Sequence, residues 1–335
     1  MNENQVRRDW LFLNRLFHRW GPNYFWRATV IAELASGPAA AIGLYYVWVT
    51  VALTIEQVFR LILLLLLLVL VANGSALWYT RRMTRTAKTV LQFYRGQHSE
   101  ETIGRAWREV TGFPARFAVF ALVNTTVLVV APAVLWIMVV WRFPLRVLPY
   151  LLIGSFIATI WISIYYYFAL YWFLWPVRQA MAPRLPSLQK RYLATVSIQT
   201  RMLVIYTALA LTTVVMMGSI AFQKSQQAVA PGANPVLVLQ ALRFHLPIIG
   251  LLVLLMTVGF SVLLTRALAT PIQHLTQVMD RVERGELHHR AELVSTDETA
   301  FLTIAFNQMI GRLAELQASL EQRVAERTAE LARRT

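Results

Sequence analysis

Few side chains in this sequence could carry out chemistry, and the first to consider is Glu33, an acidic residue inside a long apolar run. A carboxyl group in a membrane-spanning helix usually faces other helices, pairs with a base or serves a function. Glu33 could therefore pair with Arg27 near the membrane surface, or it could sense a ligand or a proton. Asn73 and Asn124 lie in other apolar runs, where amides typically form hydrogen bonds between helices.

The histidines predict neither a metal site nor a catalytic site. His274 lies on a helical pattern without the acidic and basic partners that a phospho-accepting histidine needs, so we expect it at the helix surface or at the edge of the apolar seam. His288 and His289 are adjacent, so their imidazoles should point in different directions and make a poor metal pair without further ligands. The chain also contains no Cys. We therefore predict no catalytic residue, no cofactor and no bound metal.

The elements that hold Glu33, Asn73 and Asn124 must be membrane-spanning helices. With 57% hydrophobic and only 15% charged residues, the chain is too apolar for an ordinary soluble domain. Pro38 and Pro132 should kink the first and third spans. Ala32, Ser36 and Ala40 have the small-residue spacing of close helix packing, within one chain or across a dimer. Roughly 20 apolar residues cross a bilayer, and six runs are long enough: 28–53, 61–79, 117–140, 148–172, 202–222 and 245–264.

The basic residues predict the orientation of these spans. Of the 32 Lys and Arg residues, 27 fall in the N-terminal tail, in the loops after the second and fourth spans, or beyond the sixth span. Because basic loops stay in the cytoplasm, both termini should be cytoplasmic. The net charge of +15 then lies mainly in segments beside the membrane, where it attracts anionic lipids. It therefore does not indicate binding to nucleic acid. We expect a multi-pass protein of the inner (plasma) membrane of a bacterium.

Beyond residue 265 the pattern becomes helix, connector, helix. Pro271 fits the first turn of a helix and Gly285 supplies its stop. Ser295 and Glu298 have the spacing of a capping box at the start of the next helix. Each helix carries a narrow apolar seam at spacings of 3 and 4, which neither helix can bury alone. The seam and its supports are Pro271, Ile272, Leu275, Met279, Val282, Gly285, Leu287, Leu293, Glu298, Leu302, Phe306, Asn307, Met309, Leu313 and Leu316.

This segment carries a family resemblance. Pro271-Ile272 with Leu275, then RGEL, then TDE, then FNQM follow in the order and spacing of a HAMP domain, and residues 265–317 resemble that family. The resemblance implies a parallel four-helix coiled coil, formed by two copies, that links a transmembrane receptor to a cytoplasmic output domain. The seam would then be its signalling surface. Ala300 departs from the family, which usually has Gly two residues after the DE pair, and this change favours the helix.

Two further resemblances concern the flanking regions. The six spans, with the loop FYRGQHSEETIGRAWREVTGFPARFAVFALV, are similar to the membrane region of certain bacterial class III adenylyl cyclases. The closing segment LEQRVAERTAEL resembles the signalling helix of many sensor histidine kinases. The seam also changes its spacing between Leu320, Val324 and Leu331, a stutter that permits a phase change between modules. We therefore expect an output domain beyond Thr335, of the two-component kinase type or the cyclase type.

The sequence thus predicts an all-α membrane protein with six transmembrane helices, a HAMP parallel four-helix coiled coil formed as a dimer, and a C-terminal signalling helix. The predicted segments are an amphipathic cytoplasmic tail at 1–27, the transmembrane domain at 28–264, the HAMP domain at 265–317 and the signalling helix at 318–335.

Its predicted function is that of a homodimeric sensor that relays a membrane-derived signal to an output domain or partner protein. Because the outer loops are short, a lipophilic ligand is one candidate stimulus. The alternative is an accessory membrane subunit that holds a partner through its coiled coil. A transporter is less favoured, because the spans contain few charges and no obvious inverted repeat.

Overall fold

The computed structural model describes residues 3–51, 53–92, 99–181, 197–229, 234–291 and 298–334, and these residues contain helices but no strand. Six helical stretches are long and apolar enough to cross a membrane, which confirms the predicted number of spans. They are Phe12–Val51, Ile55–Met83, Glu101–Val139, Leu145–Phe173, Ile198–Val229 and Val238–Val262.

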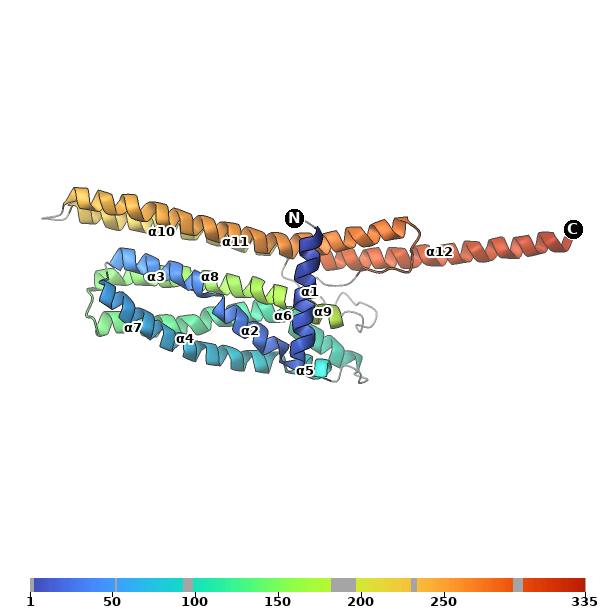
Figure 1. Ribbon diagram of the computed structural model, residues 1–335, viewed down its shortest axis with the longest axis horizontal. Helices are drawn as coiled ribbons and strands as arrows, with labels where there is room; N and C mark the ends of the chain where they lie inside the picture. The colour runs from blue at the N-terminus through green and yellow to red at the C-terminus, as the bar shows by residue number, and fades with distance from the viewer. Residues whose placement is uncertain are drawn as a thin grey trace.

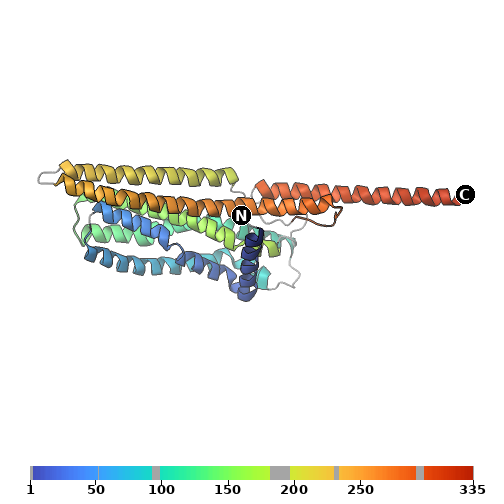
Figure 2. The ribbon, with the colours of Figure 1, turned by 45° about the horizontal axis from the view of Figure 1, so that its top comes forward.

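The helices form an elongated bundle that continues into a rod (Figures 1 and 2). Helix α1 crosses one end of the bundle, so the first span runs along the bundle only from α2 onward (Figure 1). The elements of the bundle are α1 (Glu3–Trp20), η1 (Gly21–Asn23), α2 (Tyr24–Leu34), α3 (Gly37–Val51), α4 (Ile55–Met83), α5 (Arg85–Gln92), α6 (Glu100–Thr125), η2 (Thr126–Val130), α7 (Ala131–Val139), η3 (Leu145–Val147), α8 (Leu148–Phe173), α9 (Trp175–Met181) and α10 (Ile198–Val229). Helix α11 (Pro235–Glu283) runs along the bundle, and its last part continues into the rod beside α12 (Glu298–Arg334).

Two spans are interrupted where the sequence predicted a kink. A proline ring removes one backbone donor and clashes with the carbonyl four residues earlier. Helix α2 ends at Leu34, four residues before Pro38, and α3 resumes at Gly37. In the third span, the π-helical turn η2 immediately precedes Pro132. Regular α-helix is therefore interrupted near both prolines, as expected for a kink.

Helices α3 and α8 approach each other closely because two glycines face each other. A Cβ atom added at Gly43 would lie 2.5 Å from Ala158 Cβ, and one added at Gly154 would lie 2.7 Å from side-chain atoms of Tyr46 and Val47. The first span therefore packs closely against α8 within one chain at Gly43. Of the small residues singled out in the sequence, Ala32 is buried and Ala40 is exposed, and packing across a dimer stays a prediction.

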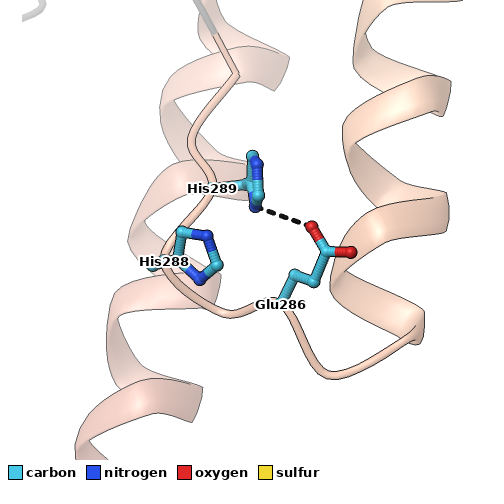
Figure 3. A group of neighbouring side chains, drawn as sticks. All are labelled: Glu286, His288 and His289. Carbon is cyan, nitrogen blue, oxygen red and sulfur yellow. Dashed lines mark ion pairs between the residues drawn. The ribbon is translucent and has the colours of Figure 1, made fainter.

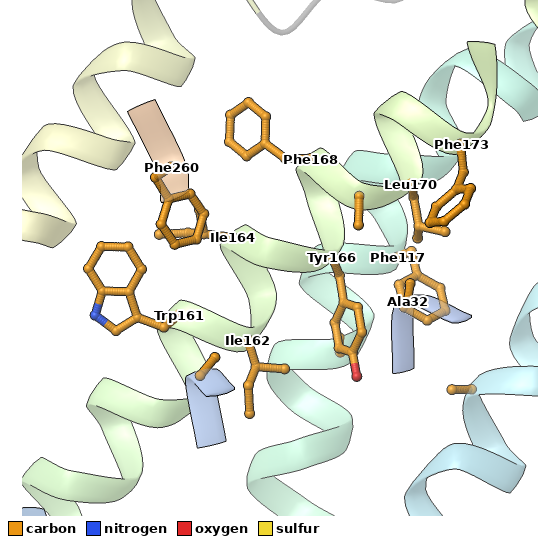
Figure 4. Close-up of a cluster of buried hydrophobic side chains, with 14 of the residues drawn as sticks. Ala32, Phe117, Trp161, Ile162, Ile164, Tyr166, Phe168, Leu170, Phe173 and Phe260 are labelled. Atoms are coloured by element: carbon orange, nitrogen blue, oxygen red, sulfur yellow. The ribbon is translucent and has the colours of Figure 1, made fainter. Parts of the chain in front are cut away.

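Helix α8 lies at the centre of the hydrophobic core. Its Tyr166 ring packs edge-on against Phe117 of α6, at 5.4 Å between ring centres. On another side, Trp161 lies 4.9 Å from Phe260 of α11 (Figure 4). The hydroxyl of Tyr24 donates to the carbonyl of Phe173 at 2.7 Å, which joins the start of α2 to the end of α8. Helix α8 thus contacts both the first span and the sixth.

Helices α10 and α11 form a hairpin along one side of the bundle (Figure 1). Its far end is attached to α3, since Tyr46 Oη lies 2.7 Å from Ser219 Oγ and Gln223 Nε2 donates to the Thr50 carbonyl at 2.7 Å. Helix α11 is a single helix of 49 residues. The prediction that a helix begins at Pro271 is therefore wrong. The proline lies inside α11, and its ring removes only one of the many backbone hydrogen bonds of that helix.

Candidate functional site

Glu33 lies at the end of α2, where the first span is interrupted. Its Oε2 accepts a short hydrogen bond from the hydroxyl of Tyr166 on α8. The amide of Asn73 on α4, oriented so that its nitrogen faces the carboxylate, donates to the same oxygen at 2.9 Å. The Tyr166 hydroxyl also lies 3.2 Å from Ser36 Oγ. Three spans therefore meet at one carboxyl group inside the membrane region.

Arg27, the base that the sequence offered as a partner of Glu33, contacts aromatic rings instead. Arg27 packs against the rings of Trp20 and Trp26, at 5.7 and 5.5 Å from their centres, so its guanidinium is directed to aromatic rings. A buried carboxyl group requires hydrogen-bond donors to offset its desolvation, and Tyr166 and Asn73 supply them. A cluster of this kind can respond to a proton or to a polar ligand by exchanging donors. The sensing role itself stays a prediction.

Asn124 forms the second polar contact between spans. Its Oδ1 accepts from Ser75 Oγ at 2.5 Å, and its Nδ2 donates to the Ala72 carbonyl at 3.1 Å. These bonds join α6 to α4 within one turn of Asn73. The prediction that Asn73 and Asn124 bond between helices is therefore confirmed, although the identity of their partners could not be read from the sequence.

The first part of α12 packs beside the last part of α11. Leu275 and Val278 of α11 form a small buried core with Phe306 and Ile310 of α12 and with Ala291 of the connector. Helix α11 ends at Glu283, and Gly285 takes a φ of +90°, a conformation that strains any residue with a side chain. The chain can therefore turn sharply and bring the second helix alongside the first.

Asn307 holds the connector against α12. Its Oδ1 accepts from the Ala291 N–H and its Nδ2 donates to the Ala291 carbonyl, both at 2.8 Å. One side chain thus satisfies both backbone groups of a buried residue that belongs to no helix. Asn307 belongs to the FNQM motif, and these two hydrogen bonds explain why the motif contains an asparagine at this position.

Residues 263–315 match the HAMP domain. No curated protein and no solved structure matches the chain. The chain is therefore an all-α membrane protein in which six spans are followed by a HAMP domain, and these features fit a membrane signal-relay module. The match covers the end of α11, the connector and the start of α12, so the contacts of α11 and α12 described above lie within the HAMP domain of one chain.

The seam residues of the HAMP domain divide into two groups. Leu275 and Phe306 are buried and Val282 and Leu287 are partly buried, in the contact between α11 and α12. Leu293 lies outside the described residues. The exposed members are Ile272, Met279, Leu302, Met309, Leu313 and Leu316. Each HAMP helix thus presents one apolar stripe to its neighbour and leaves a second stripe uncovered in one copy of the chain.

Several residues of this core were not predicted from the sequence, namely Val278, Ala291 and Ile310. A signal was present, because Val278 follows Leu275 by three residues and Ile310 follows Phe306 by four. The spacing of a coiled-coil seam predicts only one narrow apolar stripe on each helix. Two helices that pack side by side bury a wider apolar face, and these three residues belong to that wider face.

Glu298, the first residue of α12, reaches back to the membrane bundle. Its Oε2 accepts a hydrogen bond of 2.9 Å from the N–H of Ile198, the first residue of α10. Ala300 and Ile304 follow in the next turns, and both belong to the buried core of the bundle. The HAMP domain therefore contacts the membrane bundle through α12 as well as through α11. We call this the Glu298–Ile198 contact.

This contact differs from the predicted capping box. That prediction joined Glu298 to Ser295, which lies outside the described residues, whereas Oε2 of Glu298 bonds to a backbone group 100 positions away. Ala300, the departure from the family pattern, is fully buried in the same region. Its methyl group thus lies where α12 meets the bundle.

The connector also brings three potential metal ligands together (Figure 3). The ligand atoms of Glu286, His288 and His289 lie within 4.8 Å of one another, and His289 Nδ1 is 3.1 Å from Glu286 Oε2. The two imidazoles are 4.2 Å apart, so the expectation that they point in different directions is wrong. A tetrahedral zinc ion needs donors about 3.3 Å apart and, in structural sites, four protein ligands. The arrangement fits a contact between Glu286 and the partly buried His289 beside a second imidazole better than a built metal site.

Proposed function

We propose that this chain is the membrane sensor module of a receptor and relays a membrane-derived signal through its HAMP domain to a cytoplasmic output domain or partner protein. The observation that carries the proposal is the continuity of α11, which runs without interruption from Pro235, through the sixth span, to Glu283 in the HAMP domain. A tilt, shift or rotation of the span is therefore passed to the HAMP helix pair without a flexible joint.

A chain of side-chain contacts leads from Glu33 to α11. Glu33 is bonded to Tyr166 of α8, and Trp161 and Phe168 of the same helix lie 4.9 and 6.5 Å from the ring of Phe260 on α11. A change in the hydrogen bonds of Glu33 can therefore move α8 against α11.

The uncovered stripe of the HAMP domain supports a homodimer. Met309, Leu313 and Leu316 of α12 are between 43% and 58% exposed, although they are apolar and follow a coiled-coil spacing. Pairing with the same stripe of a second copy would remove them from water. The distribution of basic residues supports the orientation, with both termini and the HAMP domain in the cytoplasm at the plasma membrane.

For the output we infer a histidine kinase of the two-component type or a class III adenylyl cyclase. The closing helix favours the kinase, and the six-span membrane half favours the cyclase. The HAMP match supports a signalling output but is shared by both classes.

Disulfide crosslinking of the full-length protein in native membranes tests the relay. The chain has no Cys, so Met309→Cys provides a single thiol on the exposed stripe, and Ala318→Cys provides a control on the opposite side of α12. We expect Met309→Cys to crosslink two copies and Ala318→Cys to react far more slowly. Adding Glu33→Gln should change the Met309→Cys rate about fivefold or more, because couplings of this kind amount to about 1–3 kcal/mol.

Glu56→Gln is the matched control, since Glu56 is an exposed residue paired with Arg60 on α4. An equal effect of Glu33→Gln and Glu56→Gln would remove Glu33 from the relay. No crosslinking at Met309 would contradict the homodimer and favour the accessory-subunit alternative, which also requires a stoichiometric partner to co-purify with the chain.

A further inference from the structure

A narrow cavity lies between α3, α4, the third span and α8, in the half of the bundle away from the HAMP domain (Figure 1). Its volume is about 150 Å³, and among the described residues none that lines it is charged. The lining residues of α4 run from Leu61 to Val69, which at 1.5 Å per residue is a length of about 12 Å. An apolar cavity of this volume stays free of water and takes up apolar molecules. Because the volume is spread over this length, the cavity fits one hydrocarbon chain better than a ring system.

Small residues and an interrupted helix create this space. Gly43, Gly154 and Ala158 line the side formed by α3 and α8, so little side-chain volume fills the cavity there. On the opposite side, Val129 and Val130 belong to the π-helical turn η2. Turns of this kind are frequent at functional sites. The local features that break regular helix packing thus coincide with the cavity wall.

The cavity is closed at one end and open at the other. At the end away from the HAMP domain, the lining residues Leu61, Ile137 and Leu151 are at most 3% exposed. At the other end, Val69 is 39% exposed and Ala40 is exposed as well. A molecule dissolved in the bilayer can therefore enter beside Ala40 and Val69.

The polar cluster around Glu33 lies next to the open end. Three of its members, on three helices, are each four positions, about one helical turn, from a residue that lines the cavity. The pairs are Ser36 with Ala40, Asn73 with Val69, and Tyr166 with Ile162. Figure 4 shows Tyr166 and Ile162 on the same side of α8. The Asn73 amide also donates to the Val69 carbonyl at 3.2 Å, which joins the cluster to the cavity wall.

Glu33 has hydrogen-bonding capacity that the protein leaves unused. Its Oε2 accepts from Tyr166 and Asn73, whereas its Oε1 has no hydrogen bond among the described residues and is not fully buried. In its ionised form the carboxyl group therefore offers an acceptor at Oε1. The donors of Tyr166 and Asn73 are already bonded to Glu33 and to the Val69 carbonyl. The open end thus favours a ligand that donates a hydrogen bond over one that only accepts.

We propose that this cavity binds an uncharged aliphatic alcohol from the bilayer, with its chain inside and its hydroxyl donating to Oε1 of Glu33. The chain enters first, because the closed end is apolar, and the hydroxyl stays at the open end beside the cluster. A hydrogen bond to the carboxylate offsets the cost of placing a polar group at this depth. A pocket with apolar walls and one polar group that fixes orientation is the usual form of a small-molecule site.

Binding would change the group on which the proposed relay depends. The ligand adds a third donor to Glu33, which already joins α4 and α8 through Asn73 and Tyr166. We expect the alcohol to alter the position of α8 against its neighbours. This consequence rests on the proposed relay function, whereas the binding itself does not.

Photolabelling of the full-length protein in phosphatidylcholine nanodiscs tests the binding. The probe is a long-chain aliphatic alcohol that carries a diazirine, and its matched control is the methyl ether of the same molecule, which lacks only the hydroxyl proton. We expect labels on α4 and α8 among the residues that line the cavity. At equal concentration in the bilayer, the alcohol should label about tenfold more than the ether, as expected for a hydrogen bond to a charged group.

Glu33→Gln tests the role of the carboxylate. The glutamine amide can donate to an ether oxygen as well as accept from an alcohol, so the preference for the alcohol should fall to about twofold or less. Glu56→Gln, at an exposed position on α4, should keep the full preference. A preference that Glu33→Gln leaves intact, or equal labelling by the two probes in the unaltered protein, would overturn the proposal.

A second variant keeps the test informative if Glu33→Gln folds poorly. Ala40→Leu narrows the open end without changing any charge and should reduce labelling by the alcohol about fivefold or more. Ala41→Leu makes the same change at an exposed neighbour outside the cavity wall and should alter labelling less than about twofold. Labelling that Ala40→Leu does not reduce would mean that the probe reports only general contact with the bilayer, and this would also overturn the proposal.

The two proposals fail in different ways. Labelling with the expected preference, without any effect of the alcohol on crosslinking at Met309→Cys, would leave the binding site in place and contradict the relay. Crosslinking that responds to Glu33→Gln, in a protein that labels equally with alcohol and ether, would leave the relay in place and contradict the site.

Discussion

Asn307 makes both of its amide hydrogen bonds to one residue, Ala291, and this gives a prediction for Asn307→Ala. Both bonds, each 2.8 Å long, are lost in the variant. The loss of two hydrogen bonds, at about 0.5–1.5 kcal/mol each, should speed amide exchange at Ala291 by about 5- to 150-fold. Hydrogen exchange with mass spectrometry on the full-length protein measures this change.

The control for Asn307→Ala is Gln308→Ala, a neighbouring amide on the exposed side of α12. Its connector peptide should exchange as in the unaltered protein. Unchanged exchange at Ala291 in Asn307→Ala would mean that other contacts hold the connector.

For single residues, the sequence indicated which polar side chains form important contacts but not which groups they contact. Glu33 stood out because a carboxylate in an apolar run needs an explanation. Its main partner, Tyr166, is 133 positions away and lies among other aromatic residues that looked equivalent in the sequence. Glu298 was predicted to make a local cap, whereas its bond to Ile198 required knowing that α10 begins beside α12. Local chemistry could be predicted, and distant pairing could not.

Among the helix contacts, the crossing of α3 and α8 gives the sharpest test. In Gly154→Ala, the new methyl group would lie 2.7 Å from atoms of Tyr46 and Val47, closer than van der Waals contact allows. Overpacking of this kind destabilises by about 1–3 kcal/mol. We expect a lower midpoint of thermal unfolding in detergent, measured by loss of the monodisperse species.

Gly250→Ala is the matched control, because a Cβ at this α11 position meets nothing within 4 Å. Its midpoint should stay the same or rise slightly, since alanine favours a helix. Equal midpoints for the two variants would show that the crossing is not tightly packed.

The number of spans and the interruptions at Pro38 and Pro132 could be predicted, because both depend on local composition and on the missing proline N–H. The uninterrupted course of α11 through Pro271 could not. A proline near a change in composition usually marks a helix start, and here the residues on both sides continue the helix.

For the whole molecule, the predicted orientation can be measured with single cysteines. Gln226 is exposed near the turn between α10 and α11, and Ala318 is exposed on the rod at the opposite end. In intact cells, a membrane-impermeant maleimide should label Gln226→Cys. It should label Ala318→Cys only after permeabilisation, because the basic loops place that end in the cytoplasm. The reverse pattern would invert the orientation.

The arrangement of the helices in the bundle could not be predicted from the sequence. Apolar runs of similar composition do not specify their neighbours, since lipid and protein surroundings are equally apolar. The central place of α8 depends on small details, such as two facing glycines and the ring contacts of Trp161 and Tyr166.

The contact between Phe260 and α8 divides α11 into two nearly equal arms. At 1.5 Å per residue, the arm toward Pro235 is about 38 Å long and the arm toward Glu283 is about 35 Å long. If α11 pivots at Phe260, a tilt of about 5° displaces the HAMP end by about 3 Å, more than the 1–2 Å helix shifts common in allosteric proteins. The Pro235 end of α11 then moves by a similar distance in the opposite direction. A covalent link between that end of α11 and α3 should therefore immobilise the HAMP end from across the membrane.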